Sequence, residues 1–233
     1  MSAPDRCLNY DDVNVHVFKT GRWKQNSYIV HDTAKKQIYL IDPGGEEVSI
    51  IKLVEALGDP VTLIALTHAH HDHVGALKAV HEHFALPYYL HPADLKLLRR
   101  APLFAISFEA RKMMVPTLGQ VLLPETRRGT LSNEISYIHT PGHTGGGIVI
   151  SIGSLAFTGD TLLNKMIGRT DLPGASVTEL DASIAFMLLE LPEDSTLFPG
   201  HGEPWTLSEA KSWWSENRHQ PPEYRDEDDE RGY

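Results

Sequence analysis

Hydrophobic and polar residues alternate along many segments of this chain, and other segments are short apolar runs bounded by Gly, Pro or Asp. Alternation is typical of strands with one buried face, and a short continuous apolar run is typical of a strand buried on both faces. These patterns predict strands at residues 13–18, 27–30, 37–41, 61–66, 88–90, 121–123, 135–139, 147–152, 155–158 and 196–198.

Apolar residues also recur at helical spacing between several of these strands. This spacing predicts helices at residues 50–57, 77–84, 178–190 and 207–217. The last two open with capping-box spacing, Ser176 with Glu179 and Thr206 with Glu209.

Residues 92–116 give the least regular pattern, because Pro102 interrupts an otherwise apolar stretch. We predict short helices there that form one wall of a cleft. Strands and helices alternate without a linker or repeat, so we expect a single α/β domain over residues 1–220. Residues 221–233 contain the charged run RDEDDER, and we expect an acidic, disordered tail.

Composition narrows the class of protein. The 233 residues are 41% hydrophobic and 22% charged, as in ordinary soluble globular domains. No apolar run approaches the roughly 20 residues that cross a bilayer, and a net charge of −10 opposes binding to nucleic acid. The first ten residues show no secretory signal, and Cys7 is the only cysteine, so we expect a cytoplasmic protein.

The run THAHHDH directly follows the predicted buried strand 61–66 and contains His68, His70, Asp72 and His73. Imidazole and carboxylate groups at this density are costly to bury unless a divalent cation replaces their hydration. His68 and His70 project to the same side of an extended backbone and can hold one ion together. Asp72 and His73 lie further on and can serve a second ion.

Three later strands run into glycine-containing turns that each carry a possible ligand: His143, Asp160 and His201. Such turns aim a side chain beyond the end of a strand, so these residues are expected on one rim with the THAHHDH run. We interpret His71 as a supporting residue. The remaining histidines are interpreted as surface or hydrogen-bonded residues: His16, His31, His81, His83, His91, His139 and His219.

This ligand set resembles the signature of the metallo-beta-lactamase superfamily, in which His-x-His-x-Asp-His precedes separate His, Asp and His ligands. The resemblance covers residues 13–217 and implies a four-layer αββα sandwich with a two-metal site at one edge of the paired sheets. It also implies ligand roles: His68, His70 and His143 for the first metal, Asp72, His73 and His201 for the second, and Asp160 as the bridge.

Within the superfamily, the segments TPGHTGGG, FTGD, GRTD and FPGHG resemble the glyoxalase II group, the hydroxyacylglutathione hydrolases, especially its short bacterial members. These enzymes cleave glutathione thioesters. The full-length enzymes add a C-terminal helical domain that contacts glutathione, whereas 32 residues follow His201 here, which leaves glutathione recognition open.

Three alternatives remain beside the thioesterase. The GRTD segment also resembles persulfide dioxygenases, and that resemblance implies a single iron held by His68, His143 and Asp160. In the dioxygenases, Asp typically follows the last histidine. Here Gly202 follows His201, which favours the hydrolase. Acyl-homoserine lactonases and other ester hydrolases share the ligand pattern. A non-catalytic, metal-stabilised binding module is disfavoured, because so many ligands on an open rim exceed what a closed structural site needs.

For the hydrolase, we expect a hydroxide that bridges the two metals to attack the thioester carbonyl, with Asp72 as the catalytic residue that orients it and moves its proton. A thiolate leaving group, with a pKa of about 8.5, needs little help from an acid, which favours thioesters over lactams.

Lys165 and Arg169 follow Asp160 in a glycine-containing loop and are predicted to bind a substrate carboxylate. The alternative for Arg169 is a surface ion pair with Asp171. Zinc is the expected metal, and mixed nitrogen and oxygen ligands also suit iron or manganese. We expect a small-molecule partner and neither nucleic acid nor membrane, while the sequence leaves the oligomeric state open.

Overall fold

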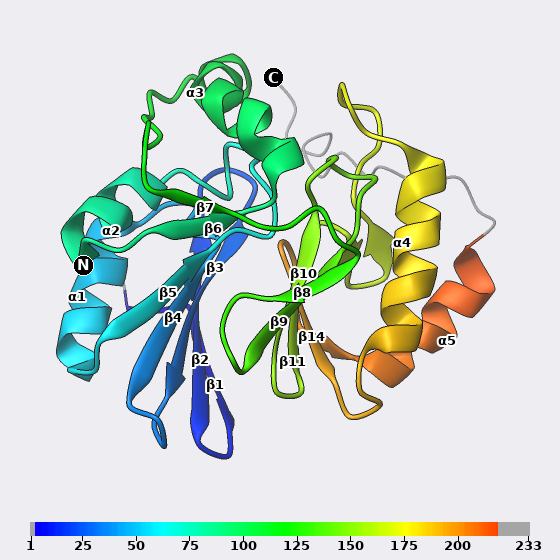
Figure 1. Cartoon of the computed structure of the whole chain (residues 1–233), viewed down its shortest axis with the longest axis horizontal. Coiled ribbons are helices and arrows are strands. Elements are labelled where there is room, and N and C mark those ends of the chain that lie inside the picture. The colour runs from blue at the N-terminus through cyan, green and yellow to red at the C-terminus, as the bar shows by residue number, and fades with distance from the viewer. Residues whose placement is uncertain (1–2, 219–233) are drawn as a thin grey trace, which may run out of the picture.

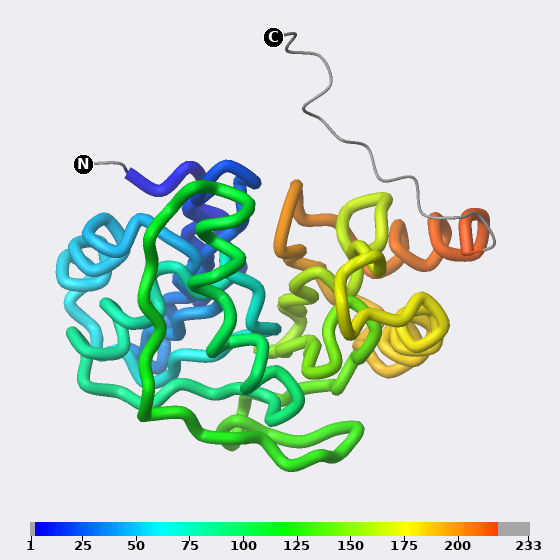
Figure 2. The backbone as a smooth tube through the Cα atoms, turned by 90° about the horizontal axis from the view of Figure 1, so that it is seen from above, coloured from blue at the N-terminus to red at the C-terminus, as the bar shows by residue number. Residues whose placement is uncertain are grey.

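The computed structural model describes residues 3–218, in which two β-sheets face each other and helices cover their outer sides (Figure 1). The first sheet has the order β1-β2-β3-β4-β5-β6-β7 and the second has the order β15-β14-β11-β10-β9-β8. Seen from above, the N-terminal and C-terminal halves lie side by side (Figure 2). This is the predicted αββα sandwich.

The first sheet is built from the N-terminal half of the chain. Its strands are β1 (Arg6–Tyr10), β2 (Val13–Thr20), β3 (Gln25–Asp32), β4 (Gln37–Ile41), β5 (Val61–Ala65), β6 (Tyr88–Leu90) and β7 (Gln120–Leu122). Strands β1 to β4 pair antiparallel, and β4 to β7 pair parallel. Its helices are α1 (Glu47–Leu57), α2 (Leu77–Phe84) and α3 (Leu95–Glu109).

The second sheet is built from the C-terminal half. Its strands are β8 (Arg128–Thr130), β9 (Ile135–His139), β10 (Ile148–Ile152), β11 (Leu155–Gly159), β14 (Thr196–Pro199) and β15 (Trp205–Thr206). A small hairpin of β12 (Leu162–Leu163) and β13 (Met166–Ile167) follows β11, and the helices are α4 (Val177–Glu190) and α5 (Leu207–Asn217). Thr206 and Glu209 form the predicted capping box, and Ser176 accepts a hydrogen bond from the backbone N–H of Glu179.

Three apolar clusters separate the four layers. One lies between the sheets and includes Tyr28, Phe157 and Phe198, whose rings contact one another edge-on or stacked. A second joins the first sheet to helices α1 to α3, and a third joins the second sheet to α4 and α5. Central strands such as β3, β4 and β11 therefore bury both of their faces, which explains why several strands appear in the sequence as continuous apolar runs.

The prediction of short helices over residues 92–116 is wrong. A short 3-10 turn at Pro92–Asp94 leads into one continuous helix, α3, with Pro102 inside it. A proline in a helix interior removes a backbone hydrogen bond and costs about 3 kcal/mol. Burial of Leu98, Ala101 and Ala105 on one face spans the proline on both sides and offsets that cost.

Several short or polar strands at the sheet edges were not predicted from the sequence. Among them are β1, with the polar sequence RCLNY, and the short strands β8, β12, β13 and β15. Their two to five residues are too few for a clear period, and pairing with a neighbouring strand defines them. No helix in residues 3–218 has both the length and the apolar character required to cross a membrane. The predicted tail 221–233 lies outside the described residues.

Candidate metal centre

The predicted ligands lie at one edge of the sandwich, where strands from both sheets end. The loop after β5 carries His68, His70, Asp72 and His73, and the loops after β9, β11 and β14 carry the other three candidates. Strands β9, β11 and β14 share one direction, because β10 is antiparallel to both β9 and β11 and β14 is parallel to β11. Their carboxyl ends therefore meet at the same edge.

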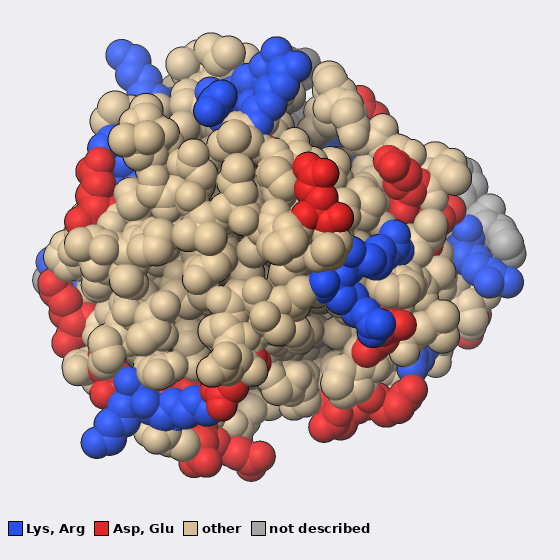
Figure 3. Space-filling model, viewed as in Figure 1, with Lys and Arg blue, Asp and Glu red and all other residues tan. Residues whose placement is uncertain are grey.

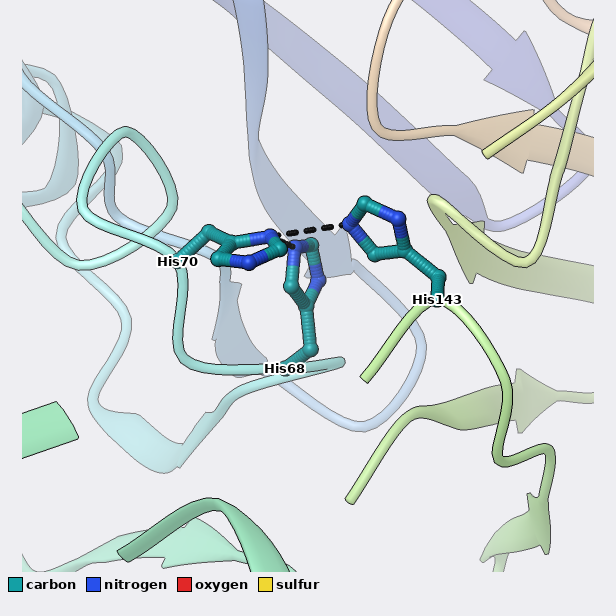
Figure 4. Close-up of side chains that lie close together, drawn as sticks. All are labelled: His68, His70 and His143. Carbon is teal, nitrogen blue, oxygen red and sulfur yellow. Dashed lines mark hydrogen bonds between the residues drawn. The ribbon is translucent and has the colours of Figure 1, made fainter. Parts of the chain in front are cut away.

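Three imidazoles form what we call the first cluster: His68, His70 and His143. His70 Nδ1 lies 3.1 Å from His68 Nε2 and 2.8 Å from His143 Nε2 (Figure 4). Burial, followed by the neighbouring histidines, lowers the pKa of His68 well below its ordinary value and lowers the pKa of His70 to about 3. His68 and His70 are therefore neutral and present ring lone pairs to a shared point.

The second cluster consists of Asp72, His73 and His201. Asp72 Oδ2 lies 3.2 Å from His201 Nε2 and 3.8 Å from His73 Nε2. Burial opposes charge on all three groups, but attraction between the carboxylates and the imidazoles outweighs it. The pKa of Asp72 is accordingly lowered, and the pKa values of His73 and His201 are raised.

Asp160 lies between the two clusters. Its Oδ1 is 3.4 Å from His73 Nε2, and its Oδ2 is 3.5 Å from His143 Nε2 and 3.6 Å from His201 Nε2. Burial would raise the pKa of Asp160, but His201 and His73 hold that pKa below its ordinary value. One carboxylate thus faces both groups of imidazoles.

Protein acceptors fix the orientation of several rings. The Nδ1–H groups of His143 and His201 each donate to a backbone carbonyl oxygen at 2.8 Å, those of Arg169 and Trp23 respectively. The Nδ1–H of His73 donates to Asp42 Oδ2 at 2.9 Å. Each contact fixes Nε2 as the nitrogen that faces the centre, where it can bind a cation once it has lost its proton.

Asp42 is a residue of the site that the sequence analysis missed. Its carboxylate is 1% exposed and accepts hydrogen bonds from the backbone N–H and hydroxyl of Thr67 as well as from His73. Asp42 begins the segment Asp42-Pro43-Gly44-Gly45, whose composition indicates a turn and does not by itself mark a site. The available signal was its position, since Asp42 follows β4 directly, as Asp160 follows β11.

The centre has the properties of a site for divalent cations. His73 Nε2 and Asp160 Oδ1 are buried and form no hydrogen bond. Such atoms are costly to bury unless another partner satisfies them. The backbone at Gly200 also lies close to the Asp160 carboxylate, because a Cβ added at Gly200 would lie 2.1 Å from Asp160 Oδ1. Neutral imidazole nitrogens and carboxylate oxygens are the donors that zinc, iron and manganese accept, so the residues fit the implied metals.

The remaining predicted site residues lie outside the two clusters. Lys165 is exposed in the turn between β12 and β13. Arg169 forms a bidentate ion pair with Asp171, with Nε and Nη2 at 2.8 and 2.7 Å from the two carboxylate oxygens. His71 Nε2 lies 3.3 Å from Glu109 Oε1 at the end of α3, and its Nδ1 lies 3.8 Å from Asp72 Oδ1, so its ring lies between the helix and the second cluster.

Comparisons with known proteins agree with this geometry. A family model described as the metallo-beta-lactamase superfamily matches residues 20–201. Hydroxyacylglutathione hydrolase GloC of Haemophilus influenzae is 30% identical, with 85% of this chain and 95% of that protein covered. The structure of TTHA1623 in a di-iron-bound form is similar with a TM-score of 0.76 and 36% identity, covering 84% of this chain and 97% of that one. The structure of BLEG-1 B3 metallo-beta-lactamase gives a TM-score of 0.77 and 30% identity, covering 85% and 96%.

Proposed function

Because the chain belongs to the metallo-beta-lactamase superfamily, we propose that it is a metal-dependent hydrolase that cleaves thioesters such as S-lactoylglutathione. Members of this superfamily are mostly metal-dependent hydrolases. The observation that carries the proposal is the position of Asp160, which faces both ligand clusters from 3.4 to 3.6 Å. That arrangement suits a pair of cations better than a single structural one.

The assignment of ligands follows the clusters. We propose that the first cluster holds one cation, the second cluster holds another, and Asp160 contacts both. When bound, two divalent cations lower the pKa of water and polarise a carbonyl oxygen. Zinc is our first choice, and iron is supported by the di-iron-bound form of the related TTHA1623.

Asp72 is the residue that we propose handles the proton. Neighbouring imidazoles lower the pKa of its carboxyl, so Asp72 is ionised at neutral pH and accepts a hydrogen bond. Its Oδ2 faces His201 Nε2, while its side chain keeps 12% of its surface exposed toward the rim. The carboxylate can therefore accept a hydrogen bond from an attacking water, orient it, and take its proton at Oδ2 only transiently, since a lowered pKa makes it a weak base. A departing thiolate needs little further help from an acid.

Lys165 and Arg169 remain our proposal for binding a substrate carboxylate. The ion pair with Asp171 means that Arg169 must exchange one carboxylate for another when substrate binds. Such exposed pairs contribute at most about 1 kcal/mol, so the exchange is accessible. On the face drawn in Figure 3, basic side chains lie in separate groups beside acidic ones, as suits a small ligand better than a nucleic acid.

Two related proteins support different substrates. The similarity to GloC supports a thioester, since that protein is named a hydroxyacylglutathione hydrolase. The similarity to BLEG-1, a B3 metallo-beta-lactamase, supports a β-lactam as the second candidate. An amine leaving group requires more acid assistance than a thiolate, which is why the thioester comes first.

Parallel assays on one preparation test the proposal. Protein reconstituted with Zn²⁺, Fe²⁺ or Mn²⁺ is supplied anaerobically with S-lactoylglutathione, with a β-lactam, and, in air, with glutathione persulfide. We expect thiol release from the thioester that Asp160→Ala abolishes. Oxygen uptake with the persulfide and no anaerobic thiol release would instead identify a dioxygenase. Activity on none of these substrates would contradict the proposed function.

A further inference from the structure

We propose that Asp94 is a positioning residue that sets the distances between the three imidazoles of the first cluster. The inference rests on the proposed metal centre but not on its substrate. Asp94 lies at the junction between the 3-10 turn Pro92–Asp94 and α3, and its carboxylate bonds to residues beside the three histidines rather than to their rings. Asp94 acts on the three histidines through the loops that carry them.

The carboxylate of Asp94 is 1% exposed and accepts three hydrogen bonds. Oδ2 accepts from the backbone N–H of Ala69 and from the hydroxyl of Thr144, both at 2.9 Å. Oδ1 accepts from the backbone N–H of Gly146 at 2.8 Å. Ala69 stands between His68 and His70 in the chain, and Thr144 directly follows His143, so every ligand of the first cluster is one residue from a donor to Asp94.

These donors belong to different sheets. Ala69 follows β5 of the first sheet, whereas Thr144 and Gly146 lie between β9 and β10 of the second sheet. Asp94 therefore joins the two halves of the sandwich at the point where the first cluster forms. Bonds from zinc to histidine nitrogen are about 2.0–2.1 Å long, and a loop displaced by a fraction of an ångström no longer meets that geometry.

The local packing leaves no space for a looser connection. A Cβ added at Gly146 would lie 2.7 Å from Asp94 Cγ, so glycine allows the backbone to approach the carboxylate this closely. Two acceptor oxygens face three donors here, an arrangement that a carboxylate satisfies and an amide does not. An asparagine has nearly the same shape, but its NH₂ group would face a donor and leave at least one of these N–H or O–H groups unsatisfied.

The second cluster has separate supports. His73 is held by Asp42, and His201 is held by the carbonyl oxygen of Trp23. The hydrogen bonds that Asp94 accepts come from Ala69, Thr144 and Gly146, which lie outside the second cluster. A change at Asp94 should consequently weaken one cation site and spare the other, which a general loss of stability would not do.

The test is a titration of metal-free protein with Zn²⁺ in the presence of a competing chelator, for wild type and Asp94→Asn. We expect wild type to bind two cations, and Asp94→Asn to bind one of them about 10- to 100-fold more weakly with the other unchanged. Co²⁺ spectra, which report the coordination of each site, should change for one ion only. The matched control is Asp32→Asn, since Asp32 is a buried acceptor at the end of β3 that bonds to Lys35; it should leave both affinities unchanged.

Thr144→Val is a milder variant that removes one donor and keeps the carboxylate, in case Asp94→Asn does not fold. It should weaken the same site by a smaller factor. Equal weakening of both sites, or no weakening in either variant, would overturn the inference while leaving the proposed hydrolase intact. A wild-type protein that binds no cation would contradict the proposed function as well, so the two failures are distinguishable.

Discussion

The first cluster gathers only imidazoles, whereas the second cluster mixes two imidazoles with the carboxylate of Asp72. The two clusters also differ in their supports. Asp94 acts on the first through the backbone on either side of its ligands, and Asp42 acts on the second by direct contact with the ring of His73. A contact to the loops sets the spacing between ligands, and a contact to a ring sets which nitrogen faces the cation.

The two clusters also differ in the charge of their histidines. The pKa values of His68 and His70 are lowered because these rings are buried among other imidazoles. The pKa values of His73 and His201 are raised because carboxylates outweigh the effect of burial. His68 and His70 therefore offer uncharged donors, while the second cluster carries both signs of charge. The histidines of the two clusters are buried to a similar extent, but their neighbours shift their pKa values in opposite directions.

Removal of the residue shared by both clusters should have the largest effect. We predict that Asp160→Ala loses affinity for both cations by more than about 100-fold, beyond the loss caused by an outer partner. Thiol release should fall with the metal content, which elemental analysis of the dialysed protein measures. Full turnover in Asp160→Ala would show that the two clusters do not depend on a common carboxylate.

Asp42→Asn should act mainly on the second cluster. The variant loses an acceptor for His73 Nδ1, and the affinity of the second site should fall by about 10- to 100-fold. A smaller effect on the first site is expected, because Asp42 also binds Thr67 beside His68. The same chelator titration measures the affinity of both sites. A stronger effect on the first site than on the second would contradict the assignment of Asp42 to the second cluster.

The region beside the first cluster should also respond to acid. His91 stacks on His139 at 3.9 Å between ring centroids, and His139 bonds to the carbonyl oxygen of Gly145. Burial, and to a lesser extent His139, lowers the pKa of His91 to about 4. Between the ordinary pKa of 6.5 and this value, the unfolded chain binds a proton that the folded protein does not, so stability is full above pH 6.5 and declines as the pH falls toward 4.

His91→Phe isolates this effect, because phenylalanine keeps a ring against His139 but does not titrate. Urea unfolding in the presence of chelator should show wild type losing about 1–3 kcal/mol more than the variant between pH 6.5 and pH 4. Above pH 6.5 the variant should be less stable than wild type by about 1 kcal/mol, since His91 accepts the backbone N–H of Ala93. Parallel pH profiles for the two proteins would refute the assignment.

Arg169→Ala should have the smallest effect. We predict a KM for a carboxylate-bearing thioester that is about 3- to 10-fold higher with kcat nearly unchanged, because the side chain binds substrate and the backbone oxygen at this position still holds His143. Asp171→Asn releases Arg169 from its ion pair and should leave KM equal or lower. An unchanged KM in Arg169→Ala would show that the Arg169 side chain does not bind the substrate.

The parts predicted from the sequence are those whose signal is local. The strand 37–41, the helix 77–84 and the helix 207–217 have the predicted bounds, because apolar spacing and caps mark them within a few residues. The convergence of His143, Asp160 and His201 on the THAHHDH loop also follows from a local rule, since each follows the end of a strand. That they bind metal stays a prediction.

The parts that were missed depend on distant partners. Asp94 receives its donors from residues that are 25 to 52 positions away, and Asp42 contacts His73 across 31 positions. No spacing in the sequence marks Asp94 as a member of the site, and the local signal for Asp42 is only that it directly follows a predicted strand. Helix α3 was predicted as fragments for a similar reason, because the buried neighbours that stabilise a helix around Pro102 come from the fold as a whole.

The first cluster draws its rings from both sheets, and this has a consequence for how the protein withstands unfolding. On the proposed assignment, a bound cation fastens the N-terminal half to the C-terminal half at the open edge of the sandwich. Free metal at about 1,000 times its dissociation constant would then add about 4 kcal/mol of apparent stability. Hydrogen exchange at the strand ends and resistance to proteases would follow the concentration of free metal.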